Sequence, residues 1–315
     1  MQEKRKIKWV LAHEPIELFL RAAEKFVEEM NGSGSEMEFE IMTLGEYSKK
    51  YNAGIPVSKH DLLDLMESNE IEMSQMYTTW LGERFNKDMH VLDLPFLFED
   101  HIHAARVLEG EVGNHLLKGL AESSNVRGLA FTYSGGFRMI PATKEIKTME
   151  DFKGLKVRAN RSPVAVDTLA AVGAIPTVME LEDITREVNS GAIAGGESTY
   201  PRFYALNQNS VCKYINDTRH SLFLTSILVN QNFWETLDED TKEKMTNAAR
   251  SAARYERSIS VDDVGIVRDR ATADGITVVD LPSEEIAKFK EMTKSVYTKY
   301  ENYFTPGLVD KIKLQ

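Results

Sequence analysis

The alternation of short apolar runs with longer amphipathic stretches is the pattern that most constrains the fold of this chain. The first apolar run, KIKWVLA, is typical of a strand, and the next stretch, IELFLRAAEKFVEEM, has its apolar residues at helical spacing. The same alternation continues through MEFEIMT, HDLLDLMESN and EIEMSQMY. A strand–helix–strand rhythm predicts a parallel sheet with helices on its faces. The predicted fold class is therefore α/β.

The rhythm starts again after two glycines, which predicts a second lobe. The strand-like run VRGLAFTYSGG ends at Gly135 and Gly136, and strand and helix patterns then alternate through IAGGES. A long helical pattern from Asp238 to about Arg268 is predicted to span both lobes. We expect the first lobe to contain residues 1–135 and about 224–263, and the second to contain residues 136–223 and about 264–315.

Composition excludes several classes of function. The 315 residues include 38 Lys and Arg against 49 Asp and Glu, a net charge of −11, and no basic patch stands out. Such a chain is a poor nucleic-acid binder, because phosphate repels it. No run of 18 apolar residues is present, so no membrane-spanning helix is expected. The single cysteine, Cys212, is expected to be a plain buried thiol.

Two arginines stand out in the segment 133–160. Arg138 follows the double glycine, and Arg158 ends the strand-like run GLKVR, with the helix-start signal TMED between them. A guanidinium presents a planar fork of N–H donors that matches a carboxylate. The segment therefore predicts capture of a small anion, although a single arginine on a strand end is more often simply exposed.

With these motifs the chain resembles the solute-binding proteins of tripartite ATP-independent periplasmic (TRAP) transporters, the DctP-like family. The resemblance runs over nearly the whole chain. Its motifs are LPFLF, GGFR, DFKGLKVR, VGAIPTVMELEDI, AIAGGES and HSLFLTSILVN. It implies a two-lobed fold like that of periplasmic binding proteins, with a ligand cleft between the lobes. It also implies an extracytoplasmic receptor that binds a small organic anion by an arginine clamp, closes around it and delivers it to TRAP membrane subunits.

The resemblance also implies roles for particular residues. Arg158 matches the family arginine that grips the ligand carboxylate, and Arg138 matches a second arginine. Glu197 matches the family glutamate, whereas Ser198 and Ala194 replace a common asparagine and aspartate. The further positions implied at the pocket are Tyr77, Trp80, Arg161, Leu181 and His220. From the residues alone we add His13, because ligand sites of α/β folds open where strands end.

Several alternatives stay open at this point. Arg138 could form a supporting salt bridge, and one arginine could pair with Glu180 or Glu197. The expected ligand is a carboxylate such as a hydroxy or sugar acid, and the alternatives are a sulfonate or phosphate-type anion, or a ligand-sensing module. An enzyme is not expected, because no GxSxG, P-loop, GxGxxG, HExxH or CxxC motif is present.

The remaining expectations concern cofactors and location. No cofactor and no metal site are expected, since His101 and His103 are two residues apart and do not share a helix face. We expect a periplasmic monomer whose signal peptide has been removed, because the sequence begins without one.

Overall fold

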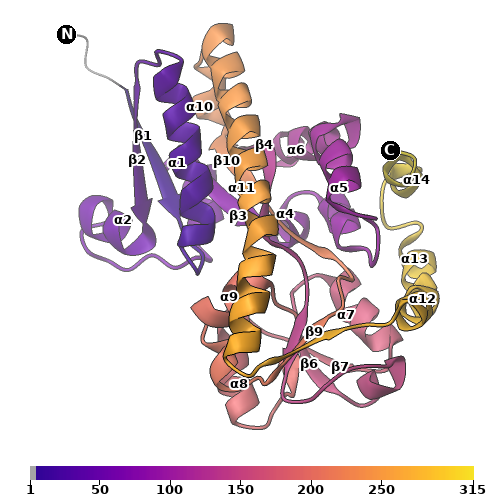
Figure 1. Ribbon diagram of the computed structural model, residues 1–315. Coiled ribbons are helices and arrows are strands. Elements are labelled where there is room, and N and C mark those ends of the chain that lie inside the picture. Colours follow the sequence, from indigo (N-terminus) through magenta and orange to yellow (C-terminus); the bar gives the residue numbers. More distant parts are fainter. Residues whose placement is uncertain (1–4) are drawn as a thin grey trace. The chain divides into compact units, whose positions relative to one another are not determined.

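The computed structural model describes residues 5–315, which form two compact units (Figure 1). Of the described residues, unit 1 contains 5–77, 105–134 and 224–258, and unit 2 contains 78–104, 135–223 and 259–315. Each unit has its own sheet with helices packed on it, so the predicted α/β class is confirmed. The long helix α11 (Glu239–Ala273), orange in Figure 1, continues from one unit into the other.

Residues 78–104 belong to unit 2, whereas the sequence analysis placed them in the first lobe. Their side chains pack on other residues of unit 2. The ring of Phe96 lies 5.1 Å from that of Phe289, and the carbonyl of Pro95 accepts a hydrogen bond of 2.8 Å from the Tyr297 hydroxyl.

The sheet of unit 1 has the strand order β2-β1-β3-β10-β4. The first three of these strands along the chain are parallel, and β10 runs antiparallel to β3. The bounds are β1 Arg5–Leu11, β2 Met37–Thr43, β3 Met73–Tyr77, β4 Val126–Phe137 and β10 Leu222–Asn230. One core joins these strands to α1 (Glu17–Gly32) and α11; within it, Trp9 and Phe26 meet edge to face at 5.1 Å.

The sheet of unit 2 has the strand order β11-β9-β5-β8-β6-β7. Strand β6 pairs in parallel with β7 and β8, whereas β5 is antiparallel to both β8 and β9. The bounds are β5 Ile140–Ala142, β6 Lys156–Ala159, β7 Ile175–Val178, β8 Gly195–Gly196, β9 Tyr214–Asp217 and β11 Thr277–Asp280. A separate apolar core under this sheet includes Val157, Phe152 and Phe289.

The remaining helices connect the strands and cover the sheets. In unit 1 and at its borders they are α2 Leu44–Tyr51, α3 Leu62–Glu67, α5 His101–Glu109, α6 Glu111–Ser123 and α10 Gln231–Glu235. In unit 2 they are α4 Thr78–Arg84, α7 Pro163–Ala171, α8 Ile184–Asn189, α9 Tyr200–Ala205, α12 Ser283–Met292, α13 Lys294–Tyr300 and α14 Leu308–Lys313, with 3₁₀ turns η1 Lys87–Asp93, η2 Met149–Phe152, η3 Leu181–Asp183 and η4 Gln208–Ser210.

Three helices show how local residues set their ends and faces. Helices α5 and α6 are separate, because Gly110 takes an extended conformation between them. Pro282 is the N-cap of α12 and provides no side-chain cap. On α11, Met245, Ala248, Ala249 and Ala252 are buried, whereas Tyr255 is 45% exposed.

Within residues 5–315, none of the helices combines the length and the apolar character that crossing a bilayer requires.

Candidate functional site

The candidate site lies at one edge of the unit 2 sheet, where parallel strands end. Strands β6, β7 and β8 run in the same direction, and so does β9, because β5 is antiparallel to both β8 and β9. Their carboxyl ends therefore meet at one edge, which we call the carboxyl edge. Open α/β sheets bind ligands at such edges. This edge brings together the residues that follow β6, β7, β8 and β9 and the residues that precede β5.

Two glycines let these strands approach closely. A Cβ atom on Gly196 would lie 2.5 Å from Cβ of Arg158, and one on Gly195 would lie 2.1 Å from the carbonyl oxygen of Pro141. Neither contact is tolerable for a larger residue. The pair in the motif AIAGGES therefore allows β8 to sit between β6 and β5, and it fixes Glu197 and Ser198 directly beyond the strand end.

Arg158 is held in a fixed orientation by the backbone. It occupies β6 opposite Gly196 and Thr177 and is 5% exposed. Its Nε donates to the carbonyl of Met179 at 2.9 Å, and its Nη1 donates to the carbonyl of Glu197 at 3.1 Å. These two bonds fix the orientation of the guanidinium at the carboxyl edge.

Glu197 is a fully buried carboxylate whose oxygens accept several hydrogen bonds. Oε1 accepts from Nε2 of His220 at 2.9 Å, and Oε2 accepts from N and Nδ2 of Asn160 at 3.1 and 3.2 Å. Burial alone would raise the pKa of this carboxyl, but Arg138, His220 and Arg158 outweigh it and lower the pKa to about 2. Glu197 is therefore ionised, and it fixes the positions of Asn160 and His220.

Arg138 is the unusual member of the group. It is 0% exposed, and none of its three guanidinium nitrogens has a hydrogen-bond partner among the described residues. Its Cζ lies over the ring of Phe223, 3.9 Å from the centroid. A cation over a desolvated ring gains about 2 kcal/mol, and the charge of Glu197 is near, but neither provides an acceptor for the buried N–H donors. Arg138 thus lacks the acceptor that its donors require.

The other predicted residues of unit 2 also lie at or beside this edge. Ser198 follows Glu197, and its buried Oγ has no hydrogen-bond partner among the described residues. Leu181, at the start of η3, is 5% exposed. The ring of His220 stacks on Phe289 at 5.8 Å, and its Nδ1 is 2.8 Å from the Thr218 hydroxyl.

Arg161 and Trp80 are brought into contact, as are Arg161 and Glu180. The Arg161 guanidinium lies 5.2 Å from the centroid of the Trp80 ring and forms an ion pair of 2.8 Å with Glu180. The pairing of an arginine with Glu180, left open by the sequence, is thus made by Arg161. Arg138 forms no hydrogen bond with a carboxylate of the described residues.

In unit 1, His13 and Tyr77 lie at the carboxyl ends of β1 and β3. Their rings are 4.3 Å apart, and Nε2 of His13 is 3.1 Å from the sulfur of Met76. His13 is 1% exposed and also contacts Phe19. These two predicted site residues therefore form an aromatic cluster in their own unit.

Sequence reasoning missed several residues of the edge. Asn160 and Thr218 support Glu197 and His220, and Arg202 is a second buried arginine over Phe223, 4.9 Å from its centroid. Their positions after β6 and β9 could have indicated Asn160 and Thr218. No sequence signal marks Arg202, because its placement depends on how α9 packs.

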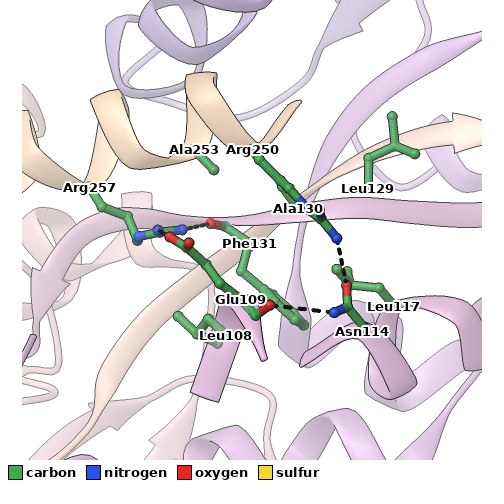
Figure 2. Close-up of a pocket in the computed structure, with 10 residues that line it drawn as sticks. All are labelled: Leu108, Glu109, Asn114, Leu117, Leu129, Ala130, Phe131, Arg250, Ala253 and Arg257. Atoms are coloured by element: carbon green, nitrogen blue, oxygen red, sulfur yellow. Dashed lines mark hydrogen bonds and ion pairs between the residues drawn. The ribbon is translucent and has the colours of Figure 1, made fainter. Parts of the chain in front are cut away.

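A small pocket in unit 1 is not a candidate for an organic ligand. Figure 2 shows it between α11, β4 and the helices α5 and α6, lined by Glu109, Asn114, Arg250 and Arg257 among others. Its cavity volume is about 10 Å³, which is room for about one water molecule.

Metal binding and thiol chemistry find no support in the described residues. Within residues 5–315 no group of three or more His, Cys, Asp or Glu side chains is arranged to hold a metal ion. Cys212 is buried, as predicted, and burial raises the pKa of its thiol to about 12, which leaves it unreactive.

Comparison with known proteins gives a family. The family model described as "Bacterial extracellular solute-binding protein, family 7" (DctP) matches residues 20–303. The C4-dicarboxylate-binding periplasmic protein DctP of Rhodobacter capsulatus is 26% identical over 239 residues, which cover 75% of this chain and 70% of the relative.

Solved structures agree with this assignment. A TRAP periplasmic solute-binding protein from Ochrobactrum anthropi, with its C-terminus bound in its ligand-binding pocket, has 25% identity and a TM-score of 0.86, covering 98% of this chain and 94% of that one. A TRAP solute-binding protein from Pseudomonas putida F1 with bound D-glucuronate has 22% identity and a TM-score of 0.84, covering 98% and 97%.

The family consists of solute-binding proteins of transport systems and not of enzymes, and its members are extracellular or periplasmic. The match over most of the chain, the two α/β units and the arginines at the carboxyl edge lead to one conclusion: this chain belongs to the DctP family of bacterial extracellular solute-binding proteins.

Proposed function

We propose that this chain is a TRAP transport receptor for a small organic acid, whose carboxylate is held by Arg138 and Arg158. The observation that carries the proposal is the buried guanidinium of Arg138, which has no hydrogen-bond partner among residues 5–315. A bound carboxylate supplies two acceptor oxygens that fit the arginine fork, and buried donors are costly when they have no acceptor.

Neighbouring groups favour an anion from the ligand over an internal partner. The oxygens of Glu197 are already used by His220 and by Asn160, although its charge lies near both arginines. The guanidinium of Arg158 is oriented by the carbonyl groups of Met179 and Glu197. A ligand carboxylate therefore meets preorganised donors, and preorganisation lowers the cost of binding.

Names of similar proteins support an organic acid as the ligand class. The Rhodobacter relative is named for C4-dicarboxylate binding, and the Pseudomonas structure contains D-glucuronate. A sulfonate or phosphate-type anion would also accept hydrogen bonds from arginine, so a panel of ligands must contain these head groups.

A thermal-shift and calorimetry panel tests this function. Hydroxy acids, sugar acids, dicarboxylates, sulfonates and phosphate esters are compared with neutral amides of the same acids. A ligand that binds the native state raises the free energy of unfolding by RT ln(1 + [L]/Kd). We expect carboxylates to stabilise the protein and their amides to have no effect. Equal stabilisation by an acid and its amide would refute a carboxylate site.

The same proposal includes closure around the ligand and delivery to TRAP membrane subunits from the periplasm. Binding proteins shift towards a closed state when the ligand prefers it. We expect a smaller radius of gyration in solution scattering when the ligand is present, and uptake by vesicles that contain the membrane subunits only when this chain is added. Uptake without this chain would contradict its role in delivery.

A further inference from the structure

One guanidinium at the carboxyl edge is already engaged by a carboxylate of the chain itself. Arg161 lies just beyond β6, and Glu180 lies just beyond β7. Both Nε and Nη2 of Arg161 donate to Oε1 of Glu180, at 3.1 and 2.8 Å. Arg161 therefore differs from Arg138, whose donors have no acceptor among the described residues.

This ion pair lies directly beside Arg158. The residue before Glu180 is Met179, whose carbonyl accepts the Nε–H of Arg158, and the amide of Met179 faces the carbonyl of Ala159 at 3.5 Å. The Arg161 guanidinium also lies over the Trp80 ring, 5.2 Å from its centroid. Next to the proposed carboxylate position there is thus a neutral ion pair on an aromatic ring.

We propose that Glu180 determines the charge of the ligand, by filling the place that a second ligand carboxylate would take on Arg161. The site then accepts acids that have one carboxylate and a neutral hydroxylated remainder, and it disfavours dicarboxylates. This inference rests on the proposed function. A second carboxylate would have to displace Glu180 from Arg161 or lie beside a like charge, and like charges in contact are unfavourable.

The charge and shape around the Arg161–Glu180 ion pair suit a ligand whose part beyond the carboxylate is neutral. Side chains of Arg161 and Glu180 are 38% and 30% exposed, so solvent screens their interaction and the discrimination is moderate. The paired groups still offer N–H donors and carboxylate acceptors to hydroxyl groups, and the Trp80 ring offers an apolar face to the C–H side of a sugar ring. A sugar acid with one carboxylate meets all of these features.

Calorimetric titrations of three proteins test the inference. The wild type, Glu180→Gln and Glu182→Gln are titrated with D-glucuronate and D-gluconate as monocarboxylates and with succinate and L-malate as dicarboxylates. Glu182 is exposed and two residues away, so its variant removes the same charge without releasing Arg161. We expect the wild type to prefer the best monocarboxylate, and Glu180→Gln to gain about fivefold in dicarboxylate affinity, as for a screened charge pair.

The outcomes separate this inference from the proposed function. Wild-type preference for dicarboxylates, an unchanged affinity ratio in Glu180→Gln, or an equal gain in Glu182→Gln would each overturn the role of Glu180 while leaving a carboxylate receptor intact. Absence of binding for all four acids and for the wider acid panel would overturn the proposed function, and the inference with it.

Discussion

Two buried arginines, one in each unit, have opposite surroundings. Arg257 in unit 1 is 7% exposed, pairs with the carboxylate of Glu109 and donates to the carbonyl of Phe131 at 2.7 Å (Figure 2). Arg138 in unit 2 is 0% exposed and lies over the Phe223 ring, and it has no hydrogen-bond partner in the described chain although the charge of Glu197 is near. One arginine is satisfied inside the fold and the other is not.

This difference separates a structural arginine from one that we assign to binding. A buried charge with partners holds elements together, and removing it leaves the partner carboxylate uncompensated. A buried charge without partners lowers the stability of the free protein, and it is retained when a ligand supplies the missing acceptor. Arg257 and Arg138 should therefore respond differently to the same substitution.

The largest expected effect concerns the carboxylate between the arginines. The folded pKa of Glu197 lies at about 2 against 4.5 in the unfolded chain, so its ionisation stabilises the fold above pH 4.5 and this stabilisation disappears as the pH falls towards 2. Integrated over that shift, the contribution is about 3 kcal/mol. In urea unfolding, the stability difference between wild type and Glu197→Gln should shrink by that amount from pH 5 to pH 2.

Glu182→Gln is the matched control for this pH series, because its carboxylate is exposed. A difference between wild type and Glu197→Gln that stays constant across the pH series would show that the arginines do not hold this carboxyl ionised.

The second effect concerns Arg158. Lysine keeps the charge and loses the fork that the carbonyls of Met179 and Glu197 orient. We expect Arg158→Lys to lower the calorimetric affinity for the acid about 100-fold, as for a buried charge pair that loses its geometry. Arg254→Lys, at an exposed ion pair with Glu109, should bind normally. An unchanged affinity in Arg158→Lys would remove Arg158 from the site.

The third effect should appear in unit 1 as a loss of stability only. Arg257→Met removes a buried partner of Glu109, which keeps its exposed partner Arg254. We expect a decrease of about 2 kcal/mol in the free energy of unfolding, below the usual range for breaking a buried pair because Glu109 is partly exposed. Ligand affinity should not change. If binding weakened as well, the two arginines would not have separate roles.

The smallest expected effect is the most distinctive. Arg138→Met removes a buried charge without hydrogen-bond partners among the described residues, which stabilises the ligand-free protein, but it also removes a charge that holds Glu197 ionised. The two effects oppose each other, so the free energy of unfolding should stay within about 1 kcal/mol of wild type. Stabilisation by the ligand in the thermal-shift assay should be strongly reduced in the same variant. A loss of stability in the ligand-free protein as large as that of Arg257→Met would indicate that Arg138 has a structural role.

Much of this arrangement could be predicted from the order of residues along the chain. The strand and helix periods indicated the α/β class, and Arg138 and Arg158 were singled out as a candidate anion site; the structure brings both arginines to one edge of a sheet. The placement of residues 78–104 could not be predicted, because it depends on contacts such as Phe96 with Phe289 that are distant in sequence.

The sequence also did not indicate which group each arginine of the site contacts. Arg138, Arg158 and Arg161 have the same side chain, yet one has no hydrogen-bond partner among the described residues, one is held by carbonyls and one by Glu180. Spacing along a strand gives the position of an arginine, whereas its partner depends on which neighbouring strand ends beside it. The positions of these arginines along the strands were therefore predictable to a greater extent than their partners.

An experimental structure of the protein with its bound acid tests the central claim most directly. The account predicts that the ligand carboxylate lies within about 3 Å of guanidinium nitrogens of both Arg138 and Arg158, while Glu197 keeps its bonds to His220 and Asn160. A ligand whose carboxylate is bound elsewhere, with Arg138 still lacking an acceptor, would contradict it.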